Sequence, residues 1–70
     1  MDRTPVSSSN VASIGYDEET QTLEIEFLSG GVYQYSGVPI DVYESLMAAG
    51  SKGSFFHKEI RNVYPTSRVG

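Results

Sequence analysis

His57 is the residue with the clearest potential for catalysis, because it carries the only imidazole in the chain. The sequence contains no cysteine, which excludes a thiolate nucleophile and a cysteine-based zinc site. A catalytic base needs a partner that it can reach and that orients it. Glu59 follows His57 by two positions on an expected helix, where side chains do not face each other. The sequence therefore predicts no catalytic residues and a protein that is not an enzyme.

The run Ser51-Lys52-Gly53-Ser54, followed by Arg61, is the pattern that best suits a binding site. Free N–H groups at the start of a helix, a small flexible residue and a nearby cation favour an anion. The run lacks the further glycine and the Lys-Ser/Thr order of a nucleotide-binding loop, so it does not indicate an NTPase. The candidate anion or nucleic-acid contacts are Ser51, Lys52, Gly53, His57, Lys58, Arg61 and Arg68.

The same residues also allow a purely structural interpretation. Ser51 is suited to cap the second helix, and Gly53 would allow close packing against the first helix. Arg61 would then pair with a carboxylate such as Glu44 or Asp41. Both interpretations remain open on the sequence alone.

Three adjacent carboxylates, Asp17-Glu18-Glu19, are the other group that could bind a cation. They lack the alternating ligand spacing and the glycine of a calcium loop. A solvated hairpin loop explains them better, because Asp17 can hydrogen-bond the backbone two residues on. We expect neither a metal nor a cofactor.

Charge is distributed unevenly along the chain. Residues 1–50 carry eight acidic residues and one basic residue, whereas residues 51–70 carry four basic residues and one acidic residue. The net charge of −4 argues against binding nucleic-acid phosphate over the whole surface. A basic C-terminal third leaves RNA contact possible there, although a basic tail that complements an acidic body is the simpler interpretation.

Seventy residues are enough for one small domain with little room for an interior cavity. No apolar run approaches the roughly 18 residues that a membrane helix needs. The first residues lead into serines and asparagine, not into an apolar signal core. Without disulfides, the expected compartment is the cytoplasm.

The segment Leu23-Glu24-Ile25-Glu26-Phe27 alternates apolar and charged residues, which predicts a strand with one buried and one wet face. Its glutamates are expected to face water. Strand-like runs at residues 11–16 and 32–36 lie at hairpin distance on either side, which predicts a three-stranded antiparallel meander. In the first run we expect Ala12, Ile14 and Tyr16 to face the core and Gly15 to mark a bulge or a close backbone approach.

Tyr33 and Tyr35 share one face of the third strand, and two placements are conceivable. On the inner face they would complete an apolar surface for a helix to cover. On the outer face, beside Glu24 and Glu26, they would resemble the stacking platforms of single-strand binders. Carboxylates on that face would repel phosphates, so the inner placement is predicted.

Two helices are expected after the sheet. Residues 40–49 have apolar positions at helical spacing, with Pro39 suited to the first turn and Gly50 to the end. Residues 52–61 form the second helical segment. The predicted class is α+β, with the order β-β-β-α-α: a flexible lead at 1–10, one domain at 11–64 and a flexible tail at 65–70.

Several segments together resemble the KTSC domain family. They are residues 6–17, Leu23-x-Ile25-x-Phe27, Gly31-x-Tyr33-x-Tyr35-x-Gly37-Val38-Pro39 and Ser51-x-Gly53-x-Phe55-Phe56-x3-Ile60-Arg61-x2-Tyr64. The resemblance covers residues 6–64. Members of this family are small bacterial and phage proteins or the C-terminal part of some lysyl-tRNA synthetases. The resemblance implies no catalytic residues and no cofactor, and it suggests a role in RNA or protein binding.

Two functional hypotheses follow. The first is a small non-catalytic interaction module, acting as a monomer or weak homodimer through a sheet edge or through an open face bearing Ser13, Gly15, Glu24, Glu26 and Gln34. The alternative is an RNA- or tRNA-associated module that binds through the basic C-terminal third. No membrane contact is expected in either case.

Overall fold

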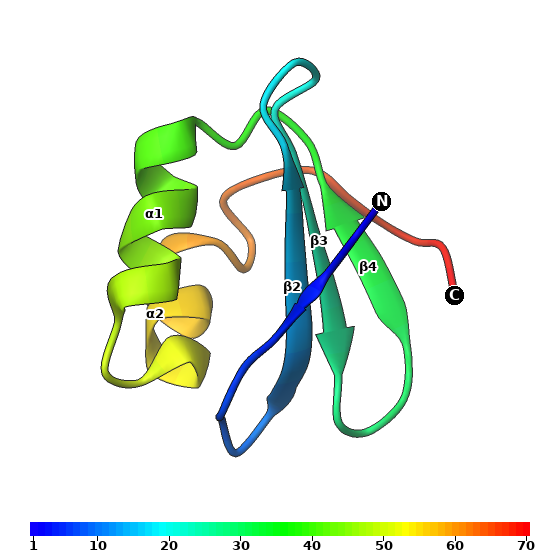
Figure 1. The fold of residues 1–70 in the computed structure, drawn as a ribbon. Coiled ribbons are helices and arrows are strands. Elements are labelled where there is room, and N and C mark those ends of the chain that lie inside the picture. The colour runs from blue at the N-terminus through cyan, green and yellow to red at the C-terminus, as the bar shows by residue number, and fades with distance from the viewer.

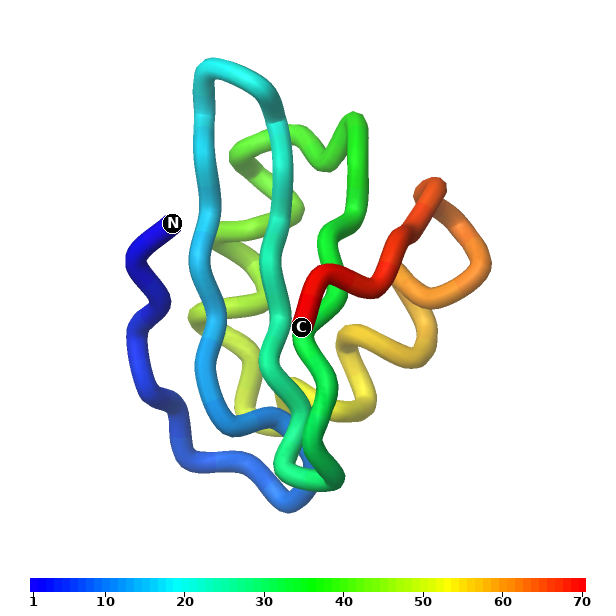
Figure 2. The backbone as a smooth tube through the Cα atoms, turned by 90° about the vertical axis from the view of Figure 1, so that its right-hand side faces the viewer, coloured from blue at the N-terminus to red at the C-terminus, as the bar shows by residue number.

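A sheet and two helices form the two layers of the fold, and the computed structural model describes all of residues 1–70. Both helices cover one face of the sheet (Figure 1), and the N-terminal segment runs along the edge formed by β2 (Figure 2). The elements in chain order are β1 (Thr4–Pro5), β2 (Val11–Asp17), β3 (Thr22–Phe27), β4 (Val32–Tyr35), α1 (Ile40–Ala48), α2 (Lys52–Glu59) and β5 (Thr66–Arg68).

The sheet is antiparallel throughout and has five strands in the order β1-β2-β3-β4-β5. The predicted meander is its centre, but the prediction of only three strands was wrong. The terminal segments, expected to be flexible, add β1 along β2 and β5 along β4 (Figure 2). Strands of two and three residues are too short to show a period-two pattern. β1 and β5 pair with β2 and β4 through contacts between distant parts of the chain.

The register places the tyrosines of β4 on the inner face. Ile25 pairs with Ile14 on one side and Tyr33 on the other, and Leu23 pairs with Tyr16 and Tyr35. Residues paired across neighbouring strands share a face. Tyr35 is only 5% exposed. The inner placement of the tyrosines is therefore confirmed.

β2 differs from the prediction in one detail. Its pairing with β3 shifts between Val11 and Ser13, so Val11 becomes fully buried while Ala12 stays partly exposed. The shift is not at Gly15. The other predicted role of Gly15, a close backbone approach, is confirmed, because a Cβ there would lie 2.6 Å from the backbone oxygen of Asp2.

The core lies between the inner face and the helices. α1 contributes Leu46, α2 contributes Phe56, and the turn after α2 contributes Ile60. Fully burying a side chain of this size stabilises the fold by about 1.5–3 kcal/mol. The nine buried core residues are Val11, Ile14, Leu23, Ile25, Tyr35, Val38, Leu46, Phe56 and Ile60.

Local sequence signals explain where the helices begin. Pro39, in extended conformation, directly precedes α1. The Ser51 hydroxyl accepts a hydrogen bond from the backbone N–H of Ser54 at 3.3 Å, as predicted for the cap of α2. Neither helix has the length or apolar composition needed to cross a bilayer.

Candidate functional site

The outer face of the sheet is not the open surface that the sequence suggested. Ser13 and Glu24 are 7% and 5% exposed, and Gly15 is also buried. The prediction that Glu24 faces water was therefore wrong. β1 pairs with the edge of β2, and Arg3, which directly precedes β1, extends its side chain across this face to Glu24. No local pattern could indicate this contact, because the two residues are far apart in the chain.

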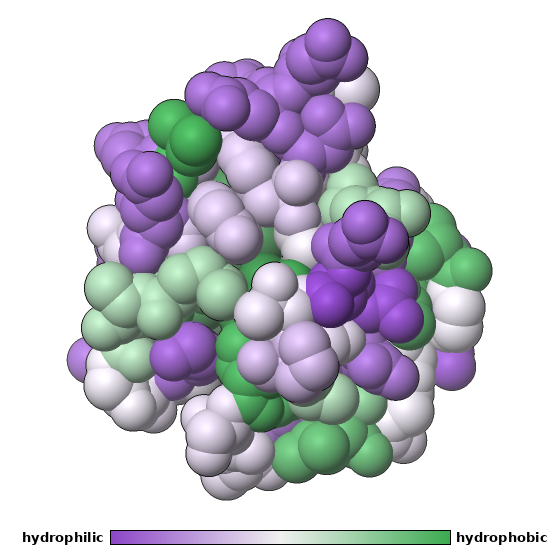
Figure 3. Space-filling model, in the orientation of Figure 1, coloured by the Kyte–Doolittle hydropathy of each residue, from purple (hydrophilic) through white to green (hydrophobic).

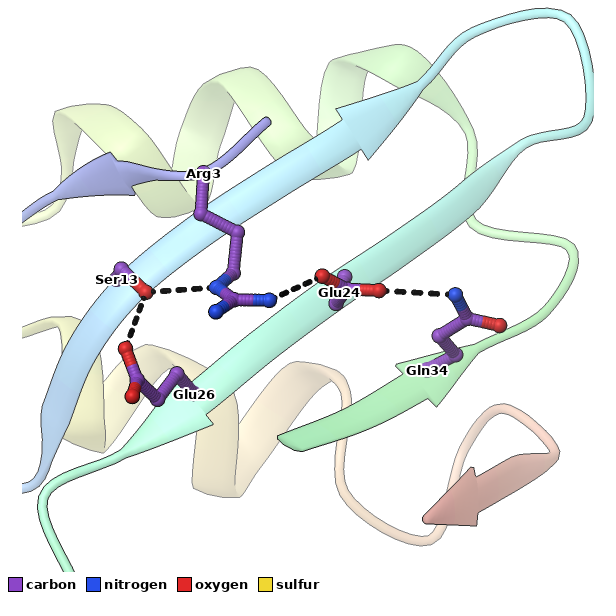
Figure 4. A network of polar contacts seen from close by, with 5 residues as sticks. All are labelled: Arg3, Ser13, Glu24, Glu26 and Gln34. Carbon is purple, nitrogen blue, oxygen red and sulfur yellow. Dashed lines mark hydrogen bonds and ion pairs between the residues drawn. The ribbon is translucent and has the colours of Figure 1, made fainter. Parts of the chain in front are cut away.

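A chain of polar contacts joins these side chains (Figure 4). Arg3 donates to Glu24 through Nη1 at 2.5 Å and to the Ser13 hydroxyl through Nε at 3.0 Å. Gln34 donates to the second oxygen of Glu24 at 2.9 Å, and Ser13 donates to Glu26 at 2.8 Å. The hydrogen bond from Gln34, together with Arg3, lowers the pKa of Glu24. These partners already occupy both oxygens of Glu24, so the face is a structural support for β1.

A pocket of about 610 Å³ opens on the other side of the molecule, where α2 meets the sheet. Backbone contacts position its walls: Leu28 donates to the carbonyl of Asn10 at 2.8 Å, which ties the N-terminal loop to the turn after β3. We call this the aromatic pocket. Its lining residues are Ser9, Asn10, Val11, Phe27, Leu28, Ser29, Tyr33, Tyr35, Gly53, Phe56, His57, Arg61, Asn62 and Thr66.

Four aromatic rings form the apolar part of the aromatic pocket. Phe27 contacts Tyr33 and Phe56 edge to face, with centroids 5.8 and 5.3 Å apart. Tyr35 contacts Phe56 in the same way at 5.5 Å. Burial raises the pKa of Tyr35, so its hydroxyl stays protonated at neutral pH. The rings therefore form a packed, uncharged floor.

A second depression, of about 290 Å³, adjoins the aromatic pocket. We call it the polar hollow, because none of its lining residues is apolar. It shares Ser9, Asn10, Gly53 and His57 with the aromatic pocket and adds Ser51, Ser54 and Lys58. The two depressions thus form one surface along α2.

No carboxylate lines either depression, although the protein has a net charge of −4. Their basic side chains are Arg61, Lys58 and His57. Three acidic residues, Asp17, Glu18 and Glu19, instead lie on the β2–β3 hairpin, at the opposite end of the sheet from α2 (Figure 1). Figure 3 shows hydrophilic residues gathered over that hairpin. This acidic hairpin therefore lies away from the two depressions.

Arg61 does not pair with Asp41 or Glu44, so that structural interpretation was wrong. Its Nη1 lies 3.3 Å from the His57 ring nitrogens, one helical turn away. The only ion pair in the chain joins Arg3 and Glu24. Arg61 and His57 are both exposed. The guanidinium is thus available to an anion at the rim of the aromatic pocket.

The structure places some of the remaining candidate residues at the depressions and others away from them. Ser51 and Gly53 border the depressions, but Gly53 packs against Asn10, not against α1 as the structural alternative supposed. Lys52 points to the end of α1, where its amine donates to the carbonyl of Ala49 at 3.2 Å. Arg68 lies on β5 with its guanidinium 5.8 Å from the centre of the Tyr33 ring. Lys52 and Arg68 line neither depression.

Lys58 also lies near acidic residues. It also borders a third depression, of about 420 Å³, that includes Asp41 and Glu59. Arg61 has no acidic neighbour in the depressions that it lines. Substituting Arg61 is therefore the more specific test of an anion site.

Sequence reasoning missed the part of the site outside α2. Ser9 and Asn10 come from the N-terminal lead, and Leu28 and Ser29 come from a turn. These segments meet α2 only in the folded chain. Leu28 is 60% exposed. The sequence could not indicate its place at the pocket, because single exposed leucines are common in proteins.

Comparison with known proteins decides the family. The KTSC domain model matches residues 7–64. The chain belongs to the KTSC domain family. A KTSC domain protein from Yersinia pestis, solved by crystallography, superposes with a TM-score of 0.97 at 45% identity, covering 99% of this chain and 97% of that one. The α+β class is confirmed.

Relatives of two lengths share this KTSC domain. An uncharacterized protein from Stutzerimonas stutzeri is 45% identical over 58 residues, covering 83% of this chain and 82% of that protein. A lysine–tRNA ligase from Trichormus variabilis is 51% identical over 49 residues, which are 70% of this chain and 9% of the ligase. The match therefore spans a small part of the ligase.

Proposed function

We propose that this KTSC protein is a small non-catalytic binding module that holds a macromolecular partner in the aromatic pocket and the polar hollow. The observation that carries the proposal is the complete absence of carboxylates from both depressions in an acidic protein. A pocket with an apolar floor and a few polar groups at its rim is the usual form of a binding site. Its volume of about 610 Å³ lies in the range of such sites.

The surroundings of His57 favour binding over catalysis. A general base needs a group that orients it and accepts or shares its charge. The side chain that contacts His57 is Arg61, a permanent cation that cannot accept a proton. Together the two side chains present hydrogen-bond donors to an anion.

A second candidate function is RNA contact, and the relatives favour it. Lysine–tRNA ligases from Trichormus variabilis and Nostoc punctiforme are 51% and 46% identical to this chain over the matched segment. Fluorescence anisotropy with labelled tRNA at two salt concentrations tests this function. Binding that weakens as salt rises would support it, and no binding at low salt would exclude it.

Affinity purification from the host with a charge-reversal pair tests the main proposal. Arg61→Glu reverses a charge in the aromatic pocket, while Arg68→Glu makes the same change on β5, outside both depressions. We expect wild-type protein and Arg68→Glu to retain the same partner and Arg61→Glu to lose it. Circular dichroism checks that both variants fold. Retention of that partner by Arg61→Glu would contradict the proposal.

A further inference from the structure

We propose that the occupant of the two depressions is an acidic peptide segment of a partner protein, an inference that rests on the proposed function. A large apolar side chain of the peptide enters the aromatic pocket. A neighbouring carboxylate lies at the rim with Arg61 and His57, and a second carboxylate reaches the polar hollow near Lys58.

The aromatic pocket is suited to an inserted side chain. Phe27, Tyr33, Tyr35 and Phe56 line it on one side, with an exposed Leu28 at its edge. Peptide recognition commonly depends on one apolar anchor in such a pocket. Removing the apolar surface of the anchor from water favours binding. An anchor of phenylalanine or leucine size would use this surface.

The polar hollow is suited to a carboxylate. Its lining offers the hydroxyls of Ser9, Ser51 and Ser54, the amide of Asn10 and the amine of Lys58. The Ser51 hydroxyl already donates to the Ser54 hydroxyl at 3.0 Å, and the other groups can donate to a ligand. No acidic side chain lines the polar hollow. Charge complementarity therefore favours a peptide with negative charge next to its anchor.

Nucleic acid fits the same surface less well. Base stacking needs an open ring face, but Tyr35 and Phe56 are only 5% and 8% exposed and their rings contact each other edge to face. Phosphate binding draws its strength from many cations. Only Arg61, Lys58 and His57 are present here, in a chain of net charge −4.

A second copy of this chain also fits poorly. The acidic loop Asp17-Glu18-Glu19-Thr20-Gln21 contains no apolar residue. The rings nearest to exposed acids, Tyr16 beside this loop and Tyr43 between Asp41 and Glu44, are stacked on each other in the fold. Such a loop would supply the negative charge without the anchor. The occupant is therefore a segment of another protein.

Chemical-shift mapping with synthetic peptides tests the inference. The probe is an acetylated, amidated pentapeptide with a central phenylalanine and two aspartates on each side. One control peptide carries asparagines in place of the aspartates, and another carries alanine in place of the phenylalanine. We expect the acidic probe to shift the amides of Asn10, Gly53 and Arg61 and to bind about tenfold more tightly than either control. Arg61→Gln should weaken the probe by a similar factor, and Arg68→Gln should not.

An octauridylate added in parallel separates the possible failures. If the oligonucleotide shifts these amides and the peptide does not, the surface remains a binding site and the peptide inference is overturned. If equal affinity is found for all three peptides, the charge argument is overturned. If neither the peptides nor the oligonucleotide shifts these amides, the inference is again overturned. The proposed function then fails as well if Arg61→Glu still retains the partner during purification from the host.

Discussion

Arg3 and Glu24 form an ion pair across 21 positions of the sequence, with Nη1 and Oε2 2.5 Å apart. The pair joins the segment before β1 to a carboxylate of β3 that the alternation of β3 had predicted to face water. Glu24 also accepts a hydrogen bond from Gln34. The outer face of the sheet is therefore held together by partly buried polar contacts, and the helix side carries the proposed binding surface.

The lowered pKa of Glu24 predicts a loss of stability in acid. Because Gln34 and Arg3 favour the ionised carboxylate in the folded state, its stabilising contribution is complete above the ordinary glutamate pKa of about 4.3. That contribution is lost as the pH falls through the lower folded-state pKa. Glu24→Gln should cost about 1–3 kcal/mol at neutral pH and show a smaller decline in acid. Urea unfolding at pH 7, 5 and 3 measures both effects.

Glu18→Gln is the matched control for this experiment, since Glu18 is exposed on the hairpin and makes no side-chain hydrogen bond. It should leave the pH profile of the wild type unchanged. If the free energy of unfolding of wild type and Glu24→Gln fell equally with pH, the Glu24 carboxylate would not contribute to the acid dependence of stability.

Gly15 predicts a second effect at β1. A Cβ at this position would lie 2.6 Å from the backbone oxygen of Asp2, so Gly15→Ala pushes the segment before β1 away from β2 and weakens the pairing of β1. We expect a loss of about 1–3 kcal/mol in the free energy of unfolding. The Val6 amide, which donates to Ala12, should exchange its proton faster.

Gly50→Ala provides the comparison, because a Cβ there meets nothing within 4 Å. It should be neutral within about 0.5 kcal/mol. If both alanine variants behaved alike in unfolding and in hydrogen exchange, the close approach of Asp2 to Gly15 would be wrong.

The sequence predicted the elements in which apolar residues recur at a regular spacing. β3 alternates, and α1 has apolar residues at helical spacing. It could not predict β1 or β5, whose pairing depends on Ile14 and Tyr33 across the sheet. For the same reason, the burial of Glu24 requires a partner, Arg3, that no local pattern identifies.

The sequence predicted only part of the candidate site. The sequence singled out the residues of α2 and Arg61 by their charges, and the structure places Arg61 at the rim of the aromatic pocket. Ser9, Asn10 and Leu28 belong to loops, and only the fold brings them to α2. Pairing of Arg61 with Asp41 or Glu44 was a reasonable expectation from charge, but Arg61 instead lies beside His57.

The cap of α2 gives a third prediction. Ser51→Ala removes the hydroxyl that accepts from the Ser54 N–H, which should lower the free energy of unfolding by about 1 kcal/mol. Ser45→Ala, at an exposed position of α1 without a side-chain hydrogen bond, should have little effect. Thermal unfolding of both variants measures the difference. An equal change in the two would mean that the cap does not stabilise α2.

Photo-cross-linking in the host tests the central claim, that the partner lies against α2, most directly. A benzoyl-phenylalanine replaces His57 in one protein and Glu18, on the hairpin at the far end of the sheet, in another. We predict a specific cross-linked product from position 57 that disappears when Arg61→Glu is added, and no product from position 18. Cross-linking from position 18 alone, or equally from both positions, would contradict a binding surface beside α2.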